Sequence, residues 1–306
     1  MRLVNECFNS VKKDYFKFLN KEKISGKFKV EKIKSLKKFY IPISFWIENK
    51  YRQKGDTLFI GFSGGQGSGK TTATGILKII LNKFFKRRTH VSSIDDFYKT
   101  VKERNKMSSI IHPLFKTRGV PGTHDIKLIK NFFNYVKKKN FKPTQLPKFD
   151  KAIDNRLKKK YWFNVKKRPE IIILEGWCVG AKPQSNFLIK KPVNKLEKNE
   201  DKNLKWRKYA NEKLKNEYKK LFKMIDDFIF IKIPNFDVVL KWRLIQESKL
   251  KKRSHLKKKI MSYNEIKRFI MFYQRITLQM IKDLSKSASI VLLLKKNHEI
   301  KKILFR

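Results

Sequence analysis

Residues 64–71 carry the pattern G-x-x-x-x-G-K-[ST], which is typical of a loop that binds nucleotide phosphates. Its glycines let the backbone turn tightly and direct successive N–H groups at phosphate oxygens, while a following helix adds the positive end of its dipole. An apolar run at 57–62 precedes the loop and helix-compatible residues 73–85 follow it, which favours this interpretation over a ligand-free turn. We therefore expect ATP or GTP to be bound by Gly64, Gly65, Gln66, Gly67, Ser68, Gly69, Lys70, Thr71 and Thr72.

Within this loop two side chains have separate chemical tasks. Lys70 is expected to reach the β- and γ-phosphates, and Thr71 to offer its hydroxyl to Mg²⁺. A second Mg²⁺ ligand is expected at Glu175, a carboxylate that directly follows another apolar run and can hold the ion itself or through water.

Two adjacent carboxylates, Asp95 and Asp96, follow the second apolar run, at 91–94. An aspartate beside Mg²⁺ and phosphate suits a small-molecule kinase, which needs a base to accept the proton of a hydroxyl group. The alternative is that one of them only caps the next helix.

Two further segments carry groups that suit an anionic, hydroxylated substrate. Residues 117–125 combine a rigid turn with Arg118, for bidentate capture of a carboxylate, and with His124 and Asp125, for hydrogen bonds to hydroxyls. Residues 146–156 add cations and one more carboxylate. Each segment taken alone could equally be a surface turn with a helix cap. The residues concerned are Lys148, Asp150, Lys151 and Arg156.

Short apolar runs alternate with helical patterns along the chain, and these predicted strands and helices must position the groups above. This alternation predicts an α/β fold of the P-loop NTPase type, a parallel sheet with helices on both faces. Ligands then lie at the carboxyl ends of the strands, where the groups above are found. The expected strands are 58–62, 91–94, 171–174, 228–233 and 290–294, and the clearest helices are 125–139 and 264–284.

Outside this alternation the chain divides into further parts. Residues 1–54 predict an N-terminal helical extension or cap, and 55–306 a kinase domain. The charge-dense stretch 190–202 is expected to be a mobile surface loop, followed by a helix with an apolar side. The basic run 249–259 could be a phosphate-closing lid near 249–260 or a solvated turn, with equal support for each.

Composition limits the partners. The chain has 306 residues, with 76 Lys and Arg against 26 Asp and Glu, giving a formal net charge of +50. Nucleic acid is the obvious partner for such a charge. Because lysine is spread over nearly the whole chain together with abundant Asn, Ile, Phe and Tyr, we favour a coding bias and expect no specific nucleic acid. The chain has two distant cysteines and no apolar run of membrane-spanning length, so a cytoplasmic location is expected, without membrane contact.

An ordered set of motifs from about residue 41 onward resembles the D-glycerate 3-kinase family, itself similar to uridine kinase, phosphoribulokinase and pantothenate kinase. The motifs are the phosphate loop, Ser-Ile-Asp-Asp-Phe-Tyr (93–98), Arg-Gly-Val-Pro-Gly-Thr-His-Asp (118–125), Pro-Lys-Phe-Asp-Lys-Ala (147–152), Glu-Gly-Trp-Cys-Val-Gly (175–180) and Trp-Arg-Leu-Ile-Gln-Glu (242–247). The resemblance implies that Asp95 is the catalytic base and that Arg243 lies on the helix leading into the lid, where it would contact the nucleotide. It also places Asp96 and Tyr98 at the substrate.

The resulting expectation is a kinase that uses ATP and Mg²⁺ to phosphorylate the 3-hydroxyl of D-glycerate, with Arg118 or Arg156 holding the carboxylate of this hydroxy acid. Two alternatives stay open. One is a kinase of the same fold acting on a nucleoside, pantothenate or another polyol, and the other is a nucleic-acid-associated NTPase. The oligomeric state and the choice between ATP and GTP cannot be predicted from the sequence.

Overall fold

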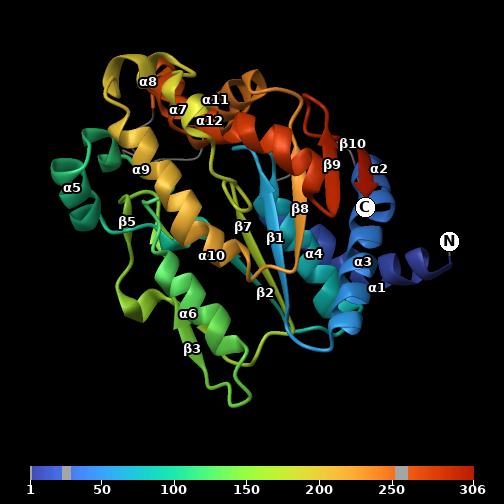
Figure 1. The fold of residues 1–306 in the computed structure, drawn as a ribbon. Helices are drawn as coiled ribbons and strands as arrows, with labels where there is room; N and C mark the ends of the chain where they lie inside the picture. The colour runs from blue at the N-terminus through green and yellow to red at the C-terminus, as the bar shows by residue number, and fades with distance from the viewer. Residues whose placement is uncertain (1, 23–28, 252–260) are drawn as a thin grey trace.

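The computed structural model describes residues 2–22, 29–251 and 261–306. Its main sheet has six strands in the order β10-β9-β8-β1-β7-β2 (Figure 1). Five of them are parallel, and β10 pairs antiparallel with β9 at one edge. The strands are β1 (Leu58–Gly64), β2 (Thr89–Ser93), β7 (Ile171–Gly176), β8 (Asp227–Lys232), β9 (Ile290–Leu294) and β10 (Ile300–Phe305).

The α/β class expected from the sequence is confirmed. The expected strand 290–294 agrees with β9, and the other four differ from the observed strands by one or two residues at an end. The second strand ends at Ser93, before Ile94, because residues 94–97 turn into a short 3-10 helix. The edge strand β10 was not foreseen. Two small two-stranded sheets lie outside the main sheet, namely β3 (Thr144–Leu146) with β6 (Phe163–Val165), and β4 (Phe149–Asp150) with β5 (Asn155–Arg156).

Helices cover both faces of the sheet, so every residue of its central strands β1 and β7 is buried. On one face lie α3 and α4, with α1 packed against α4; on the other lie α6, α9 and α10 (Figure 1). The helices are α1 (Arg2–Lys21), α2 (Lys29–Ser35), α3 (Ile41–Lys54), α4 (Lys70–Lys83), α5 (Val101–Ile110), α6 (Ile126–Val136), α7 (Asn186–Lys190), α8 (Lys195–Glu200), α9 (Lys205–Lys213), α10 (Lys219–Phe222), α11 (Asp237–Lys251) and α12 (Tyr263–Ser287).

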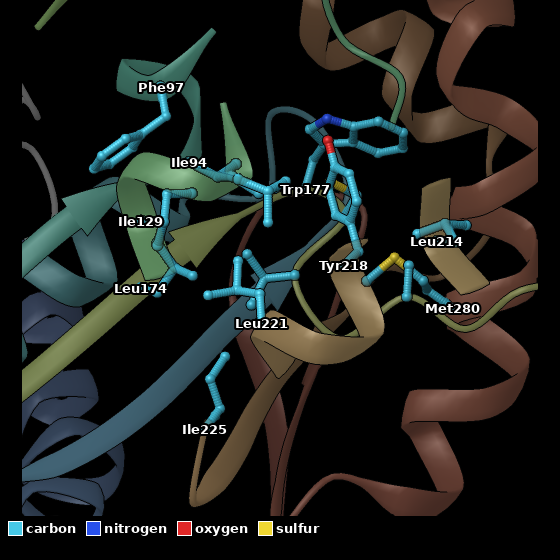
Figure 2. Packing of buried hydrophobic residues seen from close by; sticks show 14 of the residues in the cluster. Ile94, Phe97, Ile129, Leu174, Trp177, Leu214, Tyr218, Leu221, Ile225 and Met280 are labelled. Atoms are coloured by element: carbon cyan, nitrogen blue, oxygen red, sulfur yellow. The ribbon is translucent and has the colours of Figure 1, made fainter. Parts of the chain in front are cut away.

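The apolar core on the α6 side joins elements that are far apart in sequence. Figure 2 shows Ile94, Ile129, Leu174 and Leu221 pointing toward one another from the turn after β2, from α6, from β7 and from α10. All four are buried. This packing fixes the ends of β2 and β7, where the candidate catalytic groups begin.

The N-terminal helices are part of the same body of structure. Ile43 and Ile47 of α3 are fully buried in the apolar cluster that contains β1 and α4, while α1 contributes to a cluster with Ile76 and Ile80 of α4. The predicted division at residue 54 therefore stays a prediction. Within the described residues, no helix is both long and apolar enough to cross a membrane.

One expectation about mobility is wrong. The stretch 190–202 contains the helix α8 and is held to α9 and α12 by buried ion pairs. Glu197 is 1 % exposed and pairs with Arg207 and Arg275, at 3.2 Å and 2.6 Å respectively. The charge density of the stretch suggested solvent exposure throughout, but the charge of Glu197 is neutralised inside the molecule by Arg207 and Arg275. The lid expected near 249–260 falls almost wholly on residues 252–260, outside the described residues.

Candidate active site

The phosphate loop joins the end of β1 to the start of α4. Gly67 and Gly69 have φ angles of 74° and 86°, a region that residues with a Cβ atom rarely adopt. A Cβ atom at Gly64 would lie 2.9 Å from Cβ of Ile231 in the neighbouring strand. These positions therefore require glycine, and the N-terminus of α4 faces the bend as an anion-binding loop requires.

Lys70 is held at the loop by two backbone carbonyls. Its Nζ donates to the carbonyl oxygens of Gly64 and Gly65, at 3.0 Å and 3.1 Å. Burial lowers the pKa of Lys70, while the carboxylates of Glu175 and Asp95 act in the opposite direction. A cation within this loop is well placed to compensate phosphate charge.

A second polar pair lies beside Lys70. The hydroxyl of Thr71 donates to Oε1 of Glu175 at 2.9 Å. Glu175 is 4 % exposed, burial raises its pKa, and its Oε2 atom is buried without a hydrogen-bond partner. The Ser68 hydroxyl is unpartnered in the same way. Such oxygen groups fit Mg²⁺, which binds through one or two carboxylates together with phosphates rather than in a protein cage.

Asp95 forms an ion pair at the end of β2. Nζ of Lys151 donates to its Oδ2 at 2.7 Å. Burial alone would raise the pKa of Asp95, but chiefly the charge and hydrogen bond of Lys151, with a smaller contribution from Lys70, lower it to about 2. The carboxyl group is therefore ionised at neutral pH, as a proton acceptor must be.

Asp96 has different surroundings. Its Oδ1 accepts a hydrogen bond from the backbone N–H of Phe149 at 3.2 Å. Burial and the neighbouring Asp95 raise the pKa of Asp96 to about 6, even though the Phe149 bond lowers it. Asp96 does not line the cavity described next, so its predicted contact with substrate stays a prediction, whereas its bond to the β4–β5 hairpin is structural.

A cavity of about 790 Å³ lies over the phosphate loop and the ends of β2 and β7. Its lining includes twelve of the residues predicted from the sequence to bind or react: Gln66, Gly67, Gly69, Lys70, Thr71, Thr72, Asp95, Tyr98, Arg118, Lys151, Glu175 and Arg243. Of the remaining predicted residues, Gly64, Gly65 and Ser68 belong to the phosphate loop itself, and Asp96, His124, Asp125, Lys148, Asp150 and Arg156 do not line the cavity.

Of the two arginines predicted to hold the substrate carboxylate, Arg118 lines the cavity and Arg156 does not. The guanidinium of Arg118 lies over the ring of Phe149, 5.5 Å from the centroid, and its Nη1 donates to Oδ1 of Asp154. The other oxygen of Asp154 accepts from the buried Arg104 at 2.9 Å. Arg118 is therefore held by the carboxylate of Asp154, which is in turn held by Arg104. Neither Arg104 nor Asp154 was predicted, because each is a single charged residue in a segment with many.

Arg156 has a different role. It donates to the backbone carbonyl of Tyr98 at 2.9 Å and lies 3.6 Å from Asp125. Pairing of β4 with β5 places it opposite Phe149. Asp125 in turn accepts from Leu128 N–H at the start of α6, which is the helix-cap alternative considered above. Arg156 therefore binds backbone and the Asp125 carboxylate, and its predicted contact with substrate has no support from its position.

His124 is buried behind the wall of the cavity. Its ring stacks on that of Tyr98, with 4.4 Å between centroids, and its Nδ1 lies 2.6 Å from the hydroxyl of Tyr218. Burial lowers the pKa of His124 to about 4, so the ring is neutral at physiological pH. From this position it supports Tyr98 rather than facing the cavity.

The two remaining predicted residues lie on the β4–β5 hairpin. Lys148 is exposed, with Nζ 5.4 Å from the centroid of the Phe163 ring. Asp150 accepts from the N–H of Ala152 at 2.8 Å, which shapes the turn that carries Lys151. Arg243, by contrast, lies across the cavity on α11, 3.3 Å from Glu247, and its Nε atom is buried without a partner.

Comparison with known proteins now decides the family. The chain is 30% identical over 237 residues to the protein named Uncharacterized kinase mug58 of Schizosaccharomyces pombe, a match covering 74% of this chain and 82% of that protein. It is 29% identical over 226 residues to the chloroplastic D-glycerate 3-kinase of Arabidopsis thaliana, a match covering 68% of this chain and 47% of the plant protein. The chain belongs to this family of kinases. No protein-family model matches it.

The fold of this kinase agrees with a solved structure. The D-glycerate 3-kinase of Cryptococcus neoformans superposes with a TM-score of 0.73 at 22% identity, over 87% of this chain and 99% of that one. At this identity the likeness shows the fold. The chain therefore has a P-loop kinase fold, and its relatives among the kinases make it an ATP-dependent phosphotransferase.

Proposed function

We propose that this kinase transfers the γ-phosphoryl group of ATP to the 3-hydroxyl of D-glycerate, with Mg²⁺ as cofactor. One observation carries the proposal. The phosphate loop, an ionised carboxylate and an arginine suited to an anionic substrate line the same cavity, namely Lys70, Asp95 and Arg118. The names of the plant and Cryptococcus relatives agree with this acceptor.

The phosphate loop would bind the nucleotide and stabilise the transferring group. Lys70 and the amides of residues 65–71 would surround the β- and γ-phosphates, because charge on the phosphoryl oxygens must be compensated throughout a loose transition state. Thr71 and Glu175 would hold Mg²⁺, which when bound neutralises phosphate charge. Arg243, from the opposite side of the cavity, would contact the nucleotide.

Asp95 would accept the proton of the substrate hydroxyl. With a pKa of about 2 it is a weak base, which suits a reaction in which the proton leaves late, after the bond to the leaving oxygen has lengthened. Its main contribution is then orientation of the hydroxyl for in-line attack. Lys151, which pairs with Asp95, is near enough to contact the same substrate.

Arg118 would bind the carboxylate of the acceptor. Its guanidinium presents several N–H donors in one plane, of which the Asp154 contact uses Nη1. Arg118 and Lys151 place two cations on the acceptor side of the cavity, and burying them beside a neutral nucleoside would cost more than burying them beside an anion. A small hydroxy acid therefore fits better than a nucleoside. A cytoplasmic location remains part of this proposal.

The test is a direct assay with purified protein, Mg-ATP and candidate acceptors. D-glycerate should yield ADP and 3-phosphoglycerate, identified by an enzyme-coupled assay that does not respond to the 2-phospho isomer. Arg118→Ala should raise KM for D-glycerate about 10- to 100-fold and change KM for ATP less than about threefold, because a charge-assisted hydrogen bond is lost only on the acceptor side.

Lys148→Ala is the matched control, since Lys148 is an exposed cation of the same region outside the cavity. It should leave both KM values unchanged. Phosphorylation of uridine or pantothenate with none of D-glycerate would defeat the proposed acceptor while leaving the kinase assignment in place.

A further inference from the structure

The β4–β5 hairpin is anchored to the residues that directly follow the proposed base. The backbone N–H of Phe149 in β4 donates to Oδ1 of Asp96 at 3.2 Å. From β5, Arg156 donates to the carbonyl oxygen of Tyr98 through two of its nitrogens, at 2.9 Å and 3.2 Å. Both strands are therefore attached to the same short segment, and the turn between them is held beside Asp95.

This turn presents Lys151 to Asp95. Its backbone is shaped by Asp150, whose side chain accepts from the N–H of Ala152 at 2.8 Å. From here Nζ of Lys151 donates to Oδ2 of Asp95 at 2.7 Å. The side chain of Lys151 is 63% exposed and that of Asp95 is 26% exposed. An ion pair this exposed adds little to stability, so stability does not explain why the hairpin is built to present it.

The other cations on the acceptor side of the cavity are held more firmly. Arg104 and Arg118 share the carboxylate of Asp154, and the side chain of Arg104 is 1% exposed. The backbone of Arg118 is held as well, because the hydroxyl of Tyr273 in α12 donates to its carbonyl oxygen at 3.1 Å. Tyr273 is itself buried and lines the cavity. Lys151 is therefore the cation of this group that can change its partner with the least disturbance.

The charges of this group leave room for one anion. Three cations, Arg104, Arg118 and Lys151, face the two carboxylates of Asp154 and Asp95, so one positive charge is not neutralised within the group. The carboxylate of a hydroxy acid would supply the missing negative charge. Because the two arginines keep Asp154, such an acceptor would draw Lys151 away from Asp95.

We propose that Lys151 is a specificity-determining residue that restrains Asp95 until the carboxylate of an acceptor takes the place of Asp95 beside the lysine. The restraint makes the enzyme selective for an anionic alcohol over water. This inference rests on the role of Asp95 in the proposed function, but not on the identity of the acceptor.

Water is the competing nucleophile when no acceptor is bound. Its attack would form a bond from the water oxygen to the γ-phosphorus and break the bond from that phosphorus to the β–γ bridging oxygen. One proton of the water would pass to Asp95 and then to solution, and the products would be ADP and inorganic phosphate. While Lys151 holds Oδ2 of Asp95, this oxygen is less able to orient water or to accept its proton.

Hydrolysis of Mg-ATP without any acceptor tests the restraint. Lys151→Met keeps an unbranched side chain and removes the ammonium group. At pH 8, where Asp95 is ionised in both proteins, release of inorganic phosphate should become about 3- to 10-fold faster, because one partly exposed charged hydrogen bond is lost. The matched control is Lys148→Met, an exposed cation beside the same hairpin and outside the cavity, which should leave the rate unchanged. Lys70→Ala gives the background from contaminating ATPases.

The double variant Asp95→Asn, Lys151→Met decides whether the effect passes through Asp95, and it should lose the increase. An unchanged or slower rate in Lys151→Met overturns the inference. So does an increase that persists in the double variant, because Lys151 would then act only by excluding water from the cavity, and so does an equal increase in Lys148→Met. If D-glycerate is not phosphorylated while these rates behave as expected, the proposed acceptor fails and this inference stands.

Discussion

At the scale of single residues, the paired aspartates at the end of β2 divide into two roles. Asp95 lines the cavity and pairs with Lys151, whereas Asp96 turns toward the backbone of Phe149. The short 3-10 helix at 94–97 causes this division, because successive residues of such a helix are rotated by about 120°. Only one of the two adjacent carboxylates therefore faces the cavity.

The first residue-scale prediction compares the two aspartates. Asp95→Asn should lower kcat by about 10²- to 10⁴-fold, because it keeps the shape and removes the proton acceptor. Nucleotide affinity, measured by titration calorimetry, should change little. Asp96→Asn is the control and should cost much less. If Asp96→Asn proves the more damaging change, the base has been assigned to the wrong residue.

The second residue-scale prediction concerns pH. Lys151 is the principal charge that lowers the pKa of Asp95 to about 2, whereas burial acts to raise it. In Lys151→Met the pKa of Asp95 should therefore rise, so that Asp95 becomes protonated in mildly acidic solution. The acidic limb of kcat/KM, measured between about pH 4.5 and 8, should move to higher pH. Lys148→Met should leave the profile in place, and an unmoved limb in Lys151→Met would exclude this electrostatic role.

At the scale of elements, the stretch 190–202 shows how a charged sequence becomes an ordered part of the fold. Glu197 of α8 receives two hydrogen bonds from Arg275 of α12, at 2.8 Å and 2.6 Å. Asp201, also buried, lies 3.0 Å from Arg207 of α9. These ion pairs attach α8 to α9 and α12, and α12 carries Tyr273 to the cavity.

The element-scale prediction is a loss of stability. Glu197→Gln should lower the free energy of unfolding by about 3 kcal/mol or more, because the buried Arg275 loses the carboxylate that pairs with it and Arg207 loses one of its two. Urea denaturation with a constant m-value measures it. Glu200→Gln removes a carboxylate of the same helix that pairs with Arg268 in a half-exposed position, and should cost less than about 1 kcal/mol. Equal effects of the two changes would contradict a structural role for the buried cluster.

A second element-scale feature supports the phosphate loop from outside. Nε2 of His298, in the turn between β9 and β10, lies 2.9 Å from the Gly67 carbonyl, and its ring stacks on Trp242 with centroids 4.1 Å apart. Trp242 also approaches Gly67, where a Cβ atom would lie 3.1 Å from its own Cβ. The unforeseen edge strand β10 thus belongs to a hairpin that contacts the nucleotide loop.

At the scale of the whole molecule, the net charge of +50 does not explain how the site is built. The cavity uses a few cations with assigned partners, and the remaining lysines are distributed along the chain. Diffuse positive charge attracts polyanions without recognising sequence.

The whole-molecule prediction follows from this distribution. DNA or RNA should bind weakly, without sequence preference, and the affinity should fall steeply as salt is raised, because binding depends on counterion release. Fluorescence anisotropy at several salt concentrations measures this. Nucleic acid should not stimulate ATP turnover. Tight binding that resists salt, or hydrolysis that depends on nucleic acid, would revive the alternative of a nucleic-acid-associated NTPase.

The sequence by itself determined the class of fold, the phosphate loop and the carboxylates at the strand ends. These features are local, since an apolar run predicts a buried strand, glycines specify a tight turn, and parallel strands bring the residues after them to one edge. Lys70, Thr71 and Glu175 could be placed together for this reason. Their predicted roles follow from the order of strands and loops along the chain alone.

Only the tertiary structure decided which of several similar residues faces the cavity. Arg118 and Arg156 are alike in sequence, but strand pairing turns Arg156 toward the backbone of Tyr98 while Asp154 holds Arg118 at the cavity. Tyr273 reaches Arg118 across 155 residues, and Glu197 is buried by partners on two other helices. The direction of a side chain depends on packing between distant segments, which no local pattern records.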